Sequence, residues 1–139
     1  MEYFQVVVTD NVTGFISGGL FDNAASAVLS FSKYYGNRTV MDVIFRAVGS
    51  NVVTTLGDNL THAMVMFDEH GGQHLEFHAR TTGDHMKQLA KDTHKYIGCS
   101  KHWTRVQIID IRDQLMIFDY NAEEDKVLID RKSRFDYAE

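Results

Sequence analysis

The sequence predicts an α+β protein with a mainly antiparallel β-sheet and two α-helices, in a single domain that spans residues 1–139. Three observations lead to this fold class. Segments rich in β-branched and aromatic residues outnumber segments with helical periodicity, short turns can join most of them, and no linker-like composition divides the chain. We expect two hairpin-helix-strand units followed by a C-terminal β-hairpin, with both helices packed on one face of the sheet.

The first unit is predicted from the amino-terminal third of the chain. The run YFQVVVTD is typical of a β-strand, and NVTGFIS forms a hairpin with it before GGLFDN interrupts the second strand. The segment NAASAVLSFSKYYG carries a single apolar stripe, which favours a helix that Asp22 or Asn23 caps and Gly36 ends. The run TVMDVIFRAV is the next strand, and GSNVVTTLGDNLT contains a short strand and a loop.

The second unit begins with a hairpin over residues 62–80, HAMVMFDEHGGQHLEFHAR, and continues with a helix over residues 84–98. Thr82 or Asp84 can cap this helix, whose apolar residues recur at helical spacing. The runs RVQIIDI, QLMIFDY and KVLIDRK then predict three strands joined by turns that contain Asp, Asn and Glu.

The last strands predict self-association. Residues 106–111 and 115–118 are nearly continuous apolar runs, and one open sheet with a solvated face cannot bury both sides of such strands. Either the sheet folds over to cover these strands or another subunit covers them, and we expect a homo-oligomer that forms through the sheet or the C-terminal hairpin. Ile117 and Phe118 are the side chains on which oligomer size should depend.

The histidine-rich hairpin is the candidate site. A three-residue loop, His70-Gly71-Gly72, would place Asp68 directly opposite His74. That register separates apolar from polar side chains, and a one-residue slip would reverse every side chain. The apolar face then carries Ala63, Val65, Phe67, Leu75, Phe77 and Ala79, and the other face carries His62, Met64, Met66, Asp68, His74, Glu76, His78 and Arg80.

The polar face allows more than one chemistry. A binding site would use Asp68, His74, Glu76, His78, Arg80 and Trp103. Asp68, His74 and His78 are ligands that suit zinc or another divalent metal, and His74 with Glu76 can perform acid–base catalysis without a metal. The alternative interpretation is an ordinary solvated face, on which His74 and Asp68 form a cross-strand pair.

Composition restricts the function. The net charge of −5 argues against binding to a nucleic-acid backbone, and no run of 18 apolar residues predicts a membrane span. Cys99 is the only cysteine and the acidic amino terminus is unlike a secretory signal, so we expect a protein of the cytoplasm of a cell or host. Motifs of phosphate loops, dinucleotide sites and hydrolase elbows are missing from the sequence.

These observations favour a non-catalytic binding protein that acts as a homo-oligomer and binds a small anionic ligand or a protein partner. The alternative is a small enzyme that uses the His/Glu/Asp cluster of residues 62–80, with or without a metal.

Overall fold

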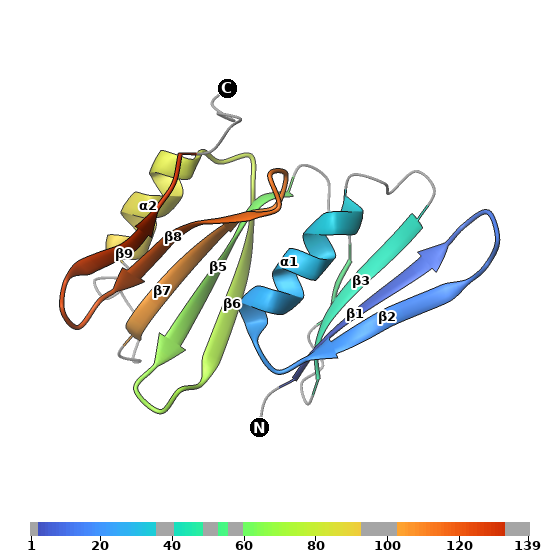
Figure 1. Ribbon diagram of the computed structural model, residues 1–139, viewed down its shortest axis with the longest axis horizontal. Helices are drawn as coiled ribbons and strands as arrows, with labels where there is room; N and C mark the ends of the chain where they lie inside the picture. The colour runs from blue at the N-terminus through green and yellow to red at the C-terminus, as the bar shows by residue number, and fades with distance from the viewer. Residues whose placement is uncertain (1–2, 36–40, 49–52, 56–59, 93–102, 133–139) are drawn as a thin grey trace.

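The computed structural model describes residues 3–35, 41–48, 53–55, 60–92 and 103–132 (Figure 1). It confirms the α+β class and the mainly antiparallel pairing of the strands, but the strands form two sheets instead of one. Within the described residues, neither helix combines the length and the apolar character needed to cross a membrane. The expected helix end at Gly98, together with Gly36 and Cys99, lies outside the described residues.

The first sheet has the strand order β2-β1-β3-β4 and is antiparallel throughout. Its elements are β1 (Tyr3–Asp10), β2 (Ile16–Phe21), α1 (Ala24–Tyr35), β3 (Met41–Val48) and β4 (Val53–Thr55). The glycines of the predicted interruption continue β2 instead of ending it. A Cβ atom at Gly18 would collide with the carbonyl oxygen of Val6, so this strand position requires glycine.

The second sheet has the strand order β6-β5-β7-β8-β9. Its elements are β5 (Leu60–Asp68), β6 (Gln73–Ala79), α2 (Gly83–Asp92), β7 (Trp103–Asp110), β8 (Leu115–Asn121) and β9 (Lys126–Asp130). The order β6-β5-β7 repeats the order β2-β1-β3 of the first sheet, and each unit places its helix between the hairpin and the third strand. The predicted order of two hairpin-helix-strand units and a terminal hairpin is therefore observed.

Helix α1 lies between the two sheets (Figure 1). Ala24, Ala27, Val28 and Phe31 are completely buried in one apolar cluster with side chains of β1, β5 and β7. Alanine and serine keep this helix thin enough for a sheet on each side. Burial of a side chain the size of Phe31 contributes about 1.5–3 kcal/mol of transfer free energy.

Helix α2 covers the opposite face of the second sheet (Figure 1). Its buried residues Met86 and Ala90 pack in a second cluster with Met64, Ile108 and Phe118. The expectation that both helices share one sheet face is therefore wrong. The physical reason is that β5 and β7 are apolar on both faces, so each face needs its own cover.

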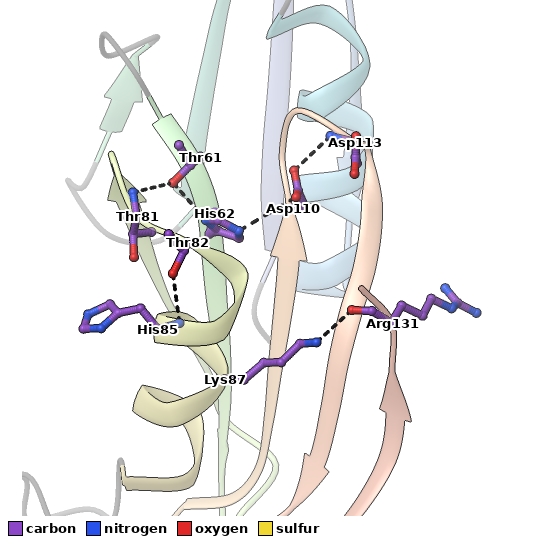
Figure 2. A network of polar contacts seen from close by, with 9 residues as sticks. All are labelled: Thr61, His62, Thr81, Thr82, His85, Lys87, Asp110, Asp113 and Arg131. Atoms are coloured by element: carbon purple, nitrogen blue, oxygen red, sulfur yellow. Dashed lines mark hydrogen bonds and ion pairs between the residues drawn. The ribbon is translucent and has the colours of Figure 1, made fainter. Parts of the chain in front are cut away.

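The apolar strands β7 and β8 are largely buried within one copy of the chain. Ile117 is 0% and Phe118 is 1% exposed, and both pack in the cluster that α2 covers. A second subunit is therefore not needed to cover these two side chains, and the homo-oligomer stays a prediction. Lys87 of α2 also donates a hydrogen bond to the Arg131 carbonyl at 2.8 Å (Figure 2). A second hydrogen bond from Lys87 to the Asp130 carboxylate, at 2.7 Å, holds β9 beside the helix.

Candidate functional site

The histidine-rich hairpin pairs in a register two residues away from the predicted one. Met66 lies opposite His74, and the Asp68 amide donates to the Gly72 carbonyl at 2.9 Å. The loop is therefore Glu69 to Gly71, with Gly71 in the left-handed conformation at φ 80°. A displacement by two residues keeps every side chain on its predicted face, so the separation of apolar from polar residues is observed although Asp68 is not directly opposite His74.

The polar face is buried over most of β5. Met64 is 2% and Met66 is 5% exposed, because both pack in the cluster that α2 covers. The polar residues of β6 lie at the margin of this covered area, where His74 and His78 are half-buried. The interpretation of a wholly solvated face is therefore wrong for β5.

Asp68 organises the turn of this hairpin. Its Oδ1 accepts hydrogen bonds from the amides of His70, at 2.9 Å, and Gly72, at 2.7 Å, while its Oδ2 lies 3.1 Å from His74 Nε2. The hydrogen bond from His74, followed by the backbone bonds, lowers the pKa of Asp68 from 3.8 to about 2. The carboxylate is ionised over the whole physiological pH range and already accepts hydrogen bonds from the loop backbone.

The other predicted site residues do not form one cluster but make separate contacts. The His78 imidazole lies 3.1 Å from the Glu76 carboxylate, which lowers the pKa of Glu76. The His74 ring meets Trp103 edge-on, with 4.8 Å between the ring centroids, and Trp103 is only 7% exposed. Arg80 is exposed at the end of β6 with a positive φ of 53°.

The proposed metal ligands lie in separate pairs. His74 binds Asp68 and His78 binds Glu76, and no group of three or more His, Cys, Asp or Glu side chains gathers in the part of the chain that the structure describes. The structure thus brings together Asp68, His74 and Trp103, and separately Glu76 and His78.

A buried polar network surrounds His62, which the sequence pattern placed on the solvated face (Figure 2). His62 Nδ1 lies 2.8 Å from Thr61 Oγ1, and Nε2 lies 3.8 Å from Asp110 Oδ2. The Thr61 hydroxyl also accepts the Thr81 amide at 3.3 Å, and Asp110 accepts the Asp113 amide at 2.9 Å. Burial is the main cause that lowers the pKa of His62 from 6.5 to about 4, so the imidazole is neutral at pH 7.

The Thr61–His62–Asp110 order is the hydroxyl–imidazole–carboxylate order of hydrolytic triads. Thr61 is 1% exposed, and His62 and Asp110 are 0% exposed, so a substrate cannot reach the hydroxyl in this structure. We assign the network a structural role, since it joins β5, β7 and the segment before α2.

The first hairpin, formed by β1 and β2, carries exposed apolar side chains that no sequence motif indicated. Val12, Phe15, Ile16 and Leu20 are 79%, 68%, 65% and 62% exposed, and we call these four residues the first-hairpin surface. Residues 11–21 contain no charged side chain, so a signal for this surface was present in the sequence. An uncharged, apolar hairpin edge is typical of a site of protein association.

A hollow of about 190 Å³ lies between β2 and α1. Ser17, Ser30 and Tyr34 contribute hydroxyl groups to its lining, and Gly19 leaves it open where a side chain would otherwise project. None of its lining residues within the described part of the chain carries a charge, so these residues offer no cationic group to an anionic ligand.

Comparisons of the chain with protein-family models, curated proteins and solved structures found no match.

Proposed function

We propose that this chain is a non-catalytic binding protein that binds a protein partner through the first-hairpin surface. The observation that carries the proposal is the exposure of Val12, Phe15, Ile16 and Leu20, which all lie within the uncharged residues 11–21. Exposed apolar side chains are common one at a time, but Ile16 and Leu20 lie on the edge strand β2, where apolar side chains are costly unless a partner covers them.

The alternative of a small enzyme that uses Asp68, His74, Glu76 and His78 has weaker support. Asp68 serves the hairpin turn, and each of the two imidazoles contacts its own carboxylate. The described lining of the hollow offers hydroxyl groups, and no positive charge, to a small anionic ligand. A protein partner needs none of these groups, because apolar contact and backbone hydrogen bonds can supply its affinity.

Site-specific photo-cross-linking tests this proposal. A photoreactive phenylalanine analogue replaces Phe15 in the full chain, and the matched control carries the same analogue at Leu128, which is 48% exposed on β9. After illumination in the native cells, we expect the Phe15 probe to give discrete protein adducts that the Leu128 probe does not give. Absence of adducts at Phe15, or the same adducts from both probes, would contradict the proposed function.

A further inference from the structure

The backbone of β2 has a defined set of groups that face away from β1. The Asp10 amide donates to the Phe15 carbonyl at 2.8 Å, which marks Asp10 and Phe15 as a hydrogen-bonded pair. Such pairs alternate with non-hydrogen-bonded pairs along two antiparallel strands. The pairing of Thr9 with Ile16 therefore belongs to the second kind, as do the pairings that involve Gly18 and Leu20.

The amide and carbonyl groups of Ile16, Gly18 and Leu20 consequently point toward the open side of β2, which is an edge of the first sheet. The same three residues lie on the sheet face opposite α1, because their β1 neighbours alternate with the buried Val6 and Val8. Backbone groups and exposed side chains are thus presented together at one edge.

We infer that a second copy of this chain pairs with β2 in antiparallel orientation, about a two-fold axis at Gly18, so that the sheet continues across the dimer. This inference rests on the proposed function and names its partner. In this register Gly18 meets the partner subunit's Gly18, and Ile16 meets the partner subunit's Leu20. An antiparallel register with hydrogen-bonded pairs at these positions uses every outward-facing backbone group of the strand.

The register is determined by the strand itself. A shift by one residue would pair outward-facing groups with residues whose backbone groups already face β1. A shift by two residues would leave either Ile16 or Leu20 without an opposite residue in β2. At the two-fold axis, glycine brings no side chain that two copies would have to accommodate.

The distribution of charge permits a second copy at this edge. Each chain carries a net charge of −5, so two copies can associate only where like charges are not brought together. The segment of residues 11–21 is uncharged and meets this condition. The edge strands of the second sheet are less suited to self-pairing, since β6 carries His74, Glu76 and His78, and β9 has Lys126 and Asp130 at its ends.

Molar mass and charge swapping test the interface. We expect the full chain to have twice its 15.9 kDa mass in solution and to dissociate on dilution. The double variant I16K/L20K places lysines opposite each other and should weaken the dimer by on the order of tenfold or more, as should I16E/L20E. A mixture of the two variants should restore a dimer, a result that misfolding cannot produce. The matched control L128K should remain dimeric.

Disulfide formation tests the register. In a C99S background, I16C mixed with L20C should form a cross-linked dimer, whereas neither variant alone should do so, because only the mixed pair lies directly opposite across the interface. A monomeric wild-type chain, a dimer that both charged variants preserve, or cross-linking of I16C with itself overturns the inference. If the chain is monomeric while the Phe15 probe still captures a different protein, the second-copy inference fails and the proposed function stands.

Discussion

The buried imidazole of His62 makes the stability of the protein depend on pH. Its pKa is about 4 in the folded chain and near 6.5 in the unfolded chain. Between these two values the unfolded state binds more protons than the folded state, so the free energy of unfolding falls as the pH falls from 6.5 to 4. At about 1.4 kcal/mol for each pH unit, the contribution lost over this window is about 3 kcal/mol.

The variant H62N removes this titration and keeps a polar side chain near Thr61. We expect the difference in unfolding free energy between the wild type and H62N, measured in urea, to decrease by about 3 kcal/mol from pH 7.5 to pH 4. The charged or titratable neighbours that also act on His62 are Asp110, His78, Arg112 and Asp113. These groups are present in both proteins, so the difference between the two proteins isolates His62.

The control is L128N, which changes an exposed side chain of β9 that does not titrate. Its difference from the wild type should stay constant over the same pH window. A constant difference between wild type and H62N from pH 7.5 to pH 4, or a difference that grows as the pH falls, would refute the assignment of His62 as a buried neutral imidazole.

Three further predictions concern the core and the second hairpin. F31A should destabilise the chain by about 3–5 kcal/mol in urea unfolding, because Phe31 is completely buried between the two sheets. D68N should speed hydrogen exchange at the His70 and Gly72 amides, which donate to the Asp68 carboxylate. In the wild type, the ionised Asp68 stabilises the folded state above pH 3.8, and this stabilisation disappears as the pH falls through about 2. The free energy of unfolding of D68N should therefore depend less on pH between 3.8 and 2. H74A should change the fluorescence of Trp103 and leave the molar mass unchanged, whereas loss of bound zinc or of a turnover activity in H74A would favour the enzyme hypothesis.

The parts of the fold that depend on local pattern were predictable. Strand composition and turn residues identified the hairpins, and the single stripe of α1 identified the helix. Burial of a second side of α1 was not predicted. Ala25 and Ser32 lie outside the predicted stripe and are also buried. Small residues beside a stripe of large ones are compatible with either a solvated or a covered face, so the sequence did not show that this helix separates two sheets.

The register of the histidine-rich hairpin was predicted wrongly for a different reason. Period-two alternation determines the face on which a side chain lies, but it is unchanged when a hairpin slips by two residues. The loop chemistry of Asp68 decides between such registers, because its carboxylate accepts the amides of His70 and Gly72. Burial of His62 beside Asp110 of β7 depends on tertiary packing, which no alternation within residues 62–80 encodes.

The two hairpin-helix-strand units share a strand order but differ in what their edge strands meet. At the edge of the second unit, the Gln73 side chain accepts the Ala24 amide at 2.7 Å and donates to the Asp22 carbonyl at 2.9 Å, which ties β6 to the start of α1. The corresponding edge strand β2 is uncharged and presents Ile16 and Leu20 to solvent. The duplicated topology thus gives two sheets with different surroundings: the second sheet has a helix on each face, and the first sheet has an exposed edge at β2. Because backbone hydrogen-bonding groups and apolar side chains lie together at this uncharged edge, the association that we propose should be lost through changes in β2 while the fold persists.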